Sequence, residues 1–209
     1  MYRLGLIDDE QSQQNAFHQT FKDDFEIYII PLNQDSTEDD LIRDGIDNHI
    51  DLLVVDYQMD HFLRFNGDSI ARRLDELNPY FPKILLTSHE NDALDFIDDA
   101  NIVNSKDIWS GDSPSDLDIF KKKLIRIINS YNSAIDEAEE ALEELEKKRI
   151  ATGLDPDEEQ RYVDKNTFLN KVFGQGKYLS GTFYSVETNR KLDSLIEKTE
   201  QLLNKFDEK

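Results

Sequence analysis

Short apolar runs alternate with longer polar stretches along the first half of the chain. The apolar runs occupy residues 2–7, 26–32, 52–55, 83–86 and 101–104. Their nearly continuous apolar character predicts strands that are buried on both faces of a parallel sheet. The stretches between them, residues 11–22, 37–48, 68–77 and 91–99, have the pattern of surface helices. Five such units within residues 1–110 favour an open doubly wound α/β sheet, since an eight-stranded barrel needs about 250 residues.

The pattern changes at Ser113 and Pro114, which suit the cap and first turn of a helix. No glycine or proline occurs from Ser115 to Thr152. Apolar residues recur there at alternating spacings of four and three, as in a coiled-coil seam: Leu124, Ile128, Tyr131, Ile135, Ala138, Leu142 and Leu145. We expect one long helix to about residue 150, with its seam against later helices of the same chain or against a second chain.

Two further helices are expected after the long one. Asp155, Pro156 and Glu158 form the start signal of a helix over residues 155–173. A last helix over residues 186–207 shows the same spacing of three and four, at Leu192, Leu195, Thr199, Leu202 and Phe206. The sequence therefore predicts an α/β domain at residues 1–130, whose last helix continues into a helical tail at residues 131–209.

Charge and composition exclude several kinds of partner and site. The chain has a net charge of −21, and residues 1–110 hold 24 acidic against 8 basic residues. Nucleic-acid binding depends on Lys and Arg, so we expect no nucleic-acid partner and favour a protein partner. The absence of cysteine excludes disulfides and thiolate chemistry.

The hydropathy of the chain gives no membrane signal. No apolar segment reaches the about 20 residues that span a bilayer. The opening residues, MYRLGLIDDEQ, lack the long apolar region of a secretion signal. We expect a cytoplasmic protein that does not bind membranes.

Acidic, hydroxyl and amine side chains follow the predicted strands. Asp8 and Asp9 follow the first strand, Asp56 the third, Thr87 ends the fourth, and Lys106 follows the fifth. The carboxyl ends of parallel strands share one edge of the sheet, where ligands bind. Carboxylates can hold Mg²⁺, an aspartate can accept a phosphoryl group, and a Lys and a hydroxyl can bind the phosphoryl oxygens. Each residue alone is also compatible with an ordinary polar strand end, whereas the full set indicates phosphoryl transfer.

This set resembles the receiver domain of two-component response regulators. The matching residues are the pair Asp8-Asp9, Asp56 after LLVV, Thr87 in ILLTS and Lys106 in NSK. The resemblance covers about residues 1–130 and implies a flavodoxin-like sheet of order 2-1-3-4-5. It also implies that Asp56 is phosphorylated by a histidine kinase or phosphotransfer protein. In the same way it implies Mg²⁺ bound by Asp9, Asp56 and the Gln58 backbone carbonyl, with Asp8 acting through water.

Gln58 and His89 occupy positions that, in the resembled family, flank the path of hydrolytic water. They are candidate residues for tuning the lifetime of the acyl phosphate, and ordinary exposed polar residues are an equal alternative. The four histidines, at positions 18, 49, 61 and 89, lack the spacing of a metal site.

Three positions depart from the family pattern. The loop after Asp56 contains the extra stretch DHFLRF and reaches its glycine, Gly67, late. This loop is expected to place bulky groups beside the site. Lys106 is followed by Asp107 instead of proline, so no cis peptide is expected there. Val103 stands where the family has its switch aromatic residue.

The leading functional hypothesis is a response regulator that signals to a downstream protein through its helical tail. A homodimer through residues 115–150 and 186–207 is a further hypothesis. A phosphorylation-independent scaffold is the alternative, and a phosphate sink or relay is a variant of the first. A phosphatase of the haloacid-dehalogenase type needs a second aspartate where this chain has Gln58. We therefore expect a signalling phosphoacceptor and not an enzyme.

Overall fold

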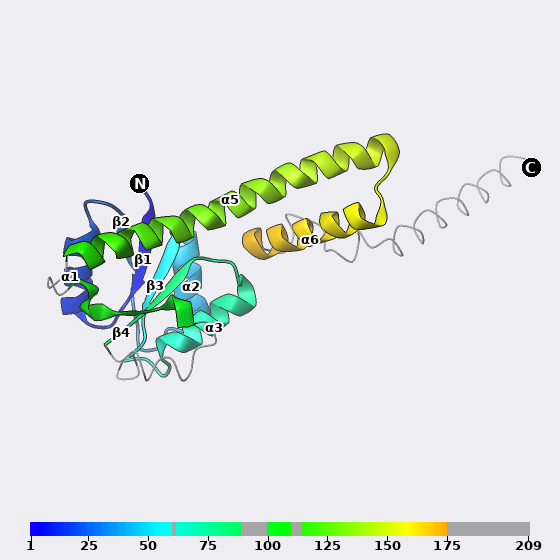
Figure 1. Cartoon of the computed structure of the whole chain (residues 1–209). Coiled ribbons are helices and arrows are strands. Elements are labelled where there is room, and N and C mark those ends of the chain that lie inside the picture. The colour runs from blue at the N-terminus through cyan, green and yellow to red at the C-terminus, as the bar shows by residue number, and fades with distance from the viewer. Residues whose placement is uncertain (60–61, 89–99, 110–113, 175–209) are drawn as a thin grey trace, which may run out of the picture. The chain divides into compact units, whose positions relative to one another are not determined.

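Five parallel strands form one sheet in the order β2-β1-β3-β4-β5 (Figure 1). The structure, a computed structural model, describes residues 1–59, 62–88, 100–109 and 114–174. The strands are β1 (Arg3–Ile7), β2 (Glu26–Ile29), β3 (Leu52–Asp56), β4 (Lys83–Thr87) and β5 (Val103–Ser105). This is the strand order of a flavodoxin-like doubly wound sheet, so the predicted fold class is confirmed. The helices predicted at residues 91–99 and 186–207 lie outside the described residues.

Helices cover both faces of the sheet. On one face lie α2 (Glu38–Asp47) and α3 (Gly67–Leu77), whose buried residues include Leu41, Ile42, Ile70 and Leu74. On the other face lie α1 (Gln11–Phe21) and the first part of α5 (Pro114–Thr152), with Phe17, Phe21, Phe120, Leu124 and Ile128. Successive strand residues alternate between the two cores, because side chains alternate along a strand: Val54 faces α1 and α5, and Val55 faces α2 and α3.

Two strands differ from the predicted ranges. β2 ends at Ile29 instead of residue 32. Ile30 still donates its backbone N–H to the Leu6 carbonyl, but Pro31 has no N–H and cannot continue the ladder. β5 begins two residues later than predicted, because residues 100–102 form the 3₁₀ helix η1 (Ala100–Ile102). The Asn104 side chain donates to the Ile102 carbonyl at 2.8 Å, a local bond that competes with strand geometry.

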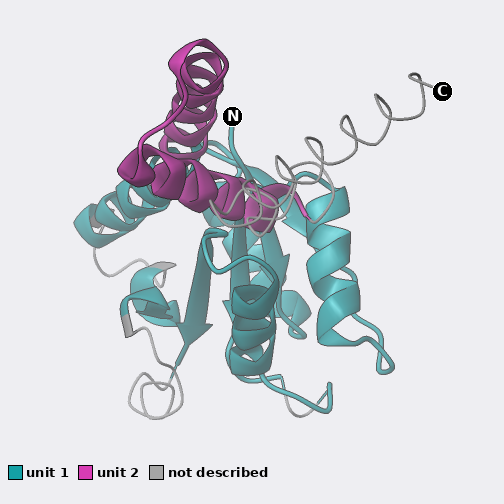
Figure 2. Ribbon diagram, turned by 90° about the vertical axis from the view of Figure 1, so that its right-hand side faces the viewer, with its two compact units in different colours: residues 1–132 teal, residues 133–209 magenta. Residues whose placement is uncertain are grey.

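The chain divides into two compact units, residues 1–132 and 133–209 (Figure 2). Helix α5 has 39 residues and belongs to both. In the second unit α6 (Pro156–Phe173) begins at the predicted start signal, with a capping box in which the Asp155 carboxylate accepts from the Glu158 N–H at 2.9 Å. Within the described part of the chain, every helix is too short or too polar to span a bilayer.

The apolar seam of α5 has two different partners. Leu124 and Ile128 belong to the core under the sheet. Tyr131 Oη accepts a hydrogen bond of 3.1 Å from Asn78 Nδ2, at the end of α3. The later seam residues instead pack against α6, in a cluster formed by Ile135, Ala138, Leu142, Leu145, Tyr162 and Leu169. The seam is therefore covered within the chain, and the homodimer through residues 115–150 and 186–207 stays a prediction.

Candidate functional site

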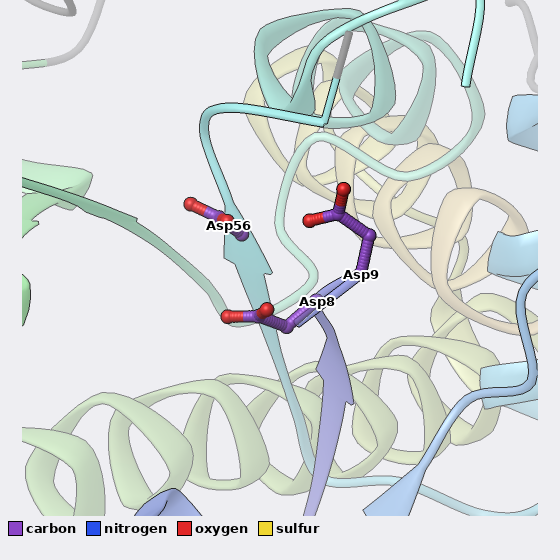
Figure 3. A group of neighbouring side chains, drawn as sticks. All are labelled: Asp8, Asp9 and Asp56. Carbon is purple, nitrogen blue, oxygen red and sulfur yellow. The ribbon is translucent and has the colours of Figure 1, made fainter. Parts of the chain in front are cut away.

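Three carboxylates meet at the carboxyl ends of β1 and β3. Ile7 of β1 pairs with Val55 of β3, so the next residues, Asp8 and Asp56, lie side by side at the ends of these two strands. Both side chains are buried, with residue exposures of 2% and 3%, while Asp9 is half-buried. One oxygen from each of the three carboxylates lies within 4.8 Å of the others, and Figure 3 shows the three side chains around the two strand ends. This spacing suits the ligation of one metal ion.

Lys106 reaches the same cluster from the end of β5, which is separated from β3 by β4. It follows β5 directly and begins the 3₁₀ helix η2 (Lys106–Trp109). Its Nζ lies 2.8 Å from Asp56 Oδ2 and 3.1 Å from Asp8 Oδ2. The ammonium group therefore bridges two buried carboxylates that come from different strands, as the strand-end pattern predicts.

Burial dominates the electrostatics of the cluster. It raises the pKa of Asp56 to about 6, although the Lys106 ammonium opposes the shift. Burial also raises the pKa of Asp8, again against the effect of Lys106. The pKa of Lys106 itself is raised, because the Asp56 and Asp8 carboxylates outweigh the burial that would lower it.

The charges of the cluster fit a divalent cation. Three ionised carboxylates and one ammonium leave two negative charges in excess. Excess charge in a buried site is costly, and the raised pKa values of Asp8 and Asp56 express that cost. An all-oxygen donor set of this kind suits a hard cation such as Mg²⁺. The residues that can hold it are Asp8, Asp9 and Asp56.

Local hydrogen bonds orient the carboxylates. Asp8 Oδ1 accepts from the backbone N–H of Glu10 at 2.8 Å, and Gln14 Nε2 donates to the Asp8 backbone carbonyl at 2.7 Å. Asp56 Oδ1 accepts from the backbone N–H of Gln58 at 3.2 Å. Gln14 is absent from the sequence-based candidates. Its position in the first turn of the helix after the acidic pair is the only signal that points to it.

Thr87 lies at the same edge of the sheet. It is the last residue of β4 and is buried. Asp56 pairs with Leu86, and Thr87 pairs with Ser105, so Thr87 sits one position beyond the level of Asp56. Its role as a ligand of the phosphoryl group stays a prediction.

The remaining candidates are placed as follows. Gln58 is exposed, two residues beyond Asp56. His89 lies outside the described residues. Val103 is half-buried and begins β5. The described residues contain no cis peptide bond, as expected from Asp107, and Ser105 Oγ accepts from the Asp107 N–H at 3.1 Å. This bond forms a local turn around Lys106.

The loop after Asp56 is anchored in the core. Met59 and Leu63 are buried and belong to the cluster beneath α2 and α3. The Met59 N–H donates to Asn66 Oδ1 at 3.2 Å, and the Gly67 N–H donates to the Tyr57 carbonyl at 3.0 Å. The bulky residues of the extra stretch therefore have different environments. Leu63 is buried in the core, whereas Phe62 is 38% exposed.

Comparisons with known proteins find only weak structural likenesses. No protein-family model and no curated protein matches the chain. A crystal structure of adenylate cyclase from Rhodopirellula baltica is similar over 63% of this chain and 92% of that chain, with 17% identity and a TM-score of 0.46. The solution structure of the apo receiver domain of nitrogen regulatory protein C covers 63% of this chain and 97% of that chain, with 14% identity and a TM-score of 0.43. Likenesses this weak carry no functional argument. The strand order and the acidic cluster are observed in this structure directly and do not depend on these likenesses.

Proposed function

We propose that this protein is a two-component response regulator in which Asp56 accepts a phosphoryl group from a histidine kinase or phosphotransfer protein. The observation that carries the proposal is the bridge from Lys106 Nζ to Asp56 and Asp8, with Asp9 within ligating reach. These residues come from three strands that are far apart in sequence. Their convergence at one edge supports a shared chemical role more strongly than any single acidic strand end does.

The proposed reaction forms an acyl phosphate on Asp56. An Asp56 oxygen attacks the phosphorus of a phosphohistidine, the new O–P bond forms as the P–N bond breaks, and the electron pair leaves with the imidazole. Lys106 donates hydrogen bonds to the transferring oxygens, and its charge offsets theirs. The Thr87 hydroxyl is proposed to bind one of the same oxygens.

Mg²⁺ is the proposed cofactor. Asp9 and Asp56 with the Gln58 carbonyl are its proposed ligands, with Asp8 linked through water. When bound, it would supply positive charge against the phosphoryl oxygens. The chain's own part is to hold Asp56 ionised and oriented, through Lys106 and the Gln58 N–H.

The proposed output is a protein contact made by the helical part of the chain. Helix α5 starts against the sheet and continues into a hairpin with α6. A charge added at Asp56 is proposed to shift the balance between two states of the first unit, and α5 to carry that change to a downstream target.

A heteronuclear NMR titration with Mg²⁺ and beryllofluoride, a phosphoryl mimic, tests this function. The wild type should show new resonances for residues around Asp56, Thr87 and Lys106, and Asp56→Asn should not. Identical spectra with and without the mimic in the wild type would instead support a phosphorylation-independent scaffold. Light scattering on the same samples then measures the molar mass of the protein, and a change in that mass would show that the helices respond by changing the oligomeric state.

A further inference from the structure

β5 leads directly into Lys106 but is a short strand at the edge of the sheet. It has three residues, all half-buried, and stands at the end of the strand order with β4 as its neighbour. Lys106 must nevertheless keep its Nζ at 2.8 Å from Asp56 Oδ2 and 3.1 Å from Asp8 Oδ2. A long, flexible Lys side chain on a short edge strand needs further support to hold such a position.

Lys123 of α5 supplies contacts to this strand. Its Nζ donates to Asn104 Oδ1 at 2.8 Å and to the Asn101 backbone carbonyl at 3.1 Å. Hydrogen bonds from a charged donor are the stronger kind. Two buried neighbours, Phe120 and Leu124, fix this part of α5 against the sheet. Lys123 thus links β5 and the turn before it to a firmly packed helix.

The contact lies close to Lys106 along the strand. Asn104 is the middle residue of β5, and Lys106 follows it two residues later, at the first position after the strand. Val103 faces the other core, under α2 and α3. A displacement of Asn104 therefore moves the backbone that carries Lys106.

We propose that Lys123 is a positioning residue for Lys106, acting through Asn104 and β5. The inference rests on the proposed phosphoacceptor function, in which Lys106 contacts the transferring oxygens. It assigns a function to one residue of the run Lys121-Lys122-Lys123. The three differ in the structure, since Lys121 pairs with Asp24 at 2.6 Å and Lys122 is exposed.

A thermodynamic cycle in the full chain tests the proposal. The coupling between Lys106 and Asp56 is obtained from urea unfolding of the wild type, Lys106→Met, Asp56→Asn and the double variant. The same cycle is then measured in the Lys123→Met and Lys122→Met backgrounds. Each background loses one positive charge from neighbouring positions of α5, so Lys122→Met is the matched control. A general loss of stability cancels within each cycle.

We expect the coupling to fall by at least half in the Lys123→Met background and to stay unchanged in the Lys122→Met background. Asn104→Ala should produce the same loss, and adding it to Lys123→Met should produce no further loss. Full coupling with Lys123→Met, or no coupling in the wild type, would overturn the proposal. If Lys123→Met does not fold, the Asn104→Ala background decides in its place.

The rate of Asp56 phosphorylation by acetyl phosphate gives the second readout. Lys123→Met should slow it about as much as Lys106→Met does, at least tenfold, and Lys122→Met should leave it unchanged. A chain that shows the coupling but takes up no phosphate in any variant would refute the proposed function and leave the positioning role standing. A wild-type rate in Lys123→Met would refute the positioning role alone.

Discussion

The Cα of Gly67 lies directly against the backbone carbonyl of Asp56. A Cβ at position 67 would overlap the Asp56 carbonyl oxygen and stand 2.9 Å from Val55 Cγ1. Gly67 also donates its N–H to the Tyr57 carbonyl at 3.0 Å. The start of α3 is therefore pressed onto the end of β3, and this close approach fixes the backbone that carries Asp56.

Gly67→Ala should displace Asp56, because the nearest atom, the Asp56 carbonyl oxygen, belongs to the backbone and cannot rotate away. We expect a loss of about 1 to 3 kcal/mol in the free energy of unfolding, and slower phosphorylation of Asp56. Urea denaturation and acetyl phosphate uptake measure the two effects. Gly45→Ala is the control, since its Cβ would meet the side-chain ends of Ile50 and Ile30, away from the site. Equal phosphorylation rates in the two variants would contradict the inferred contact.

Asp56→Asn should stabilise the metal-free protein at pH 8. Burial raises the pKa of Asp56 to about 6, so the folded protein binds this proton more tightly than the unfolded chain does. The ionised carboxylate therefore destabilises the fold above about pH 6, and this effect disappears as the pH falls towards 4. The expected gain at pH 8 is about 3 kcal/mol, because each unit of pKa difference corresponds to about 1.4 kcal/mol.

Urea unfolding in the presence of a chelator, from pH 8 to pH 4, measures this gain. The stability difference between Asp56→Asn and the wild type should shrink as the pH falls through 6. A difference that is independent of pH would show that the Asp56 carboxyl titrates normally in the folded protein.

Mg²⁺ should stabilise the wild type against heat, because it binds the folded carboxylate cluster. At a concentration one hundred times its Kd the expected stabilisation is about 2.7 kcal/mol. Asp9→Asn should lose most of this effect. Glu10→Gln is the control, because its side chain is exposed and only its backbone N–H contacts Asp8. Calorimetric scans with Mg²⁺ and with chelator compare the three proteins, and an equal shift in Asp9→Asn would place the cation elsewhere.

Tyr162→Ala should release α6 from α5. The Tyr162 ring is buried in the hairpin core, its Oη donates to Glu146 at 3.0 Å, and the Arg149 guanidinium lies 5.2 Å from the ring centre. Truncating a buried aromatic ring costs about 3 kcal/mol or more. Hydrogen exchange of the α6 amides should therefore accelerate, while exposed Thr167→Ala should leave it unchanged. Unchanged exchange in Tyr162→Ala would show that other contacts hold the hairpin.

The sheet and the central site are predictable from sequence for one physical reason. Parallel strands buried on both faces leave continuous apolar runs, and their carboxyl ends share one edge. The sequence therefore predicts that Asp8, Asp56 and Lys106 lie at the same edge of the sheet. The predicted start of β5 is two residues too early, because an apolar pattern does not reveal the 3₁₀ helix η1 or the bond from the Asn104 side chain to the Ile102 carbonyl.

Partners of a helix face are harder to predict. The spacing of the α5 seam shows that a face is apolar, but it does not show what covers it. Within this one seam, Ile128 meets the core under the sheet, whereas Leu142 meets α6. An apolar pattern also fails to identify Asn166, a polar residue that is buried within α6 and donates to the Tyr162 carbonyl at 3.0 Å.

The central claim is that Asp56 accepts a phosphoryl group, and intact-mass spectrometry after incubation with acetyl phosphate and Mg²⁺ tests it most directly. The wild type should gain the mass of one phosphoryl group, lose it on treatment with hydroxylamine, and gain none when Mg²⁺ is chelated. Asp56→Asn should gain none under any condition. A wild type that stays unmodified with Mg²⁺ present, or an adduct that persists in Asp56→Asn, would contradict the account.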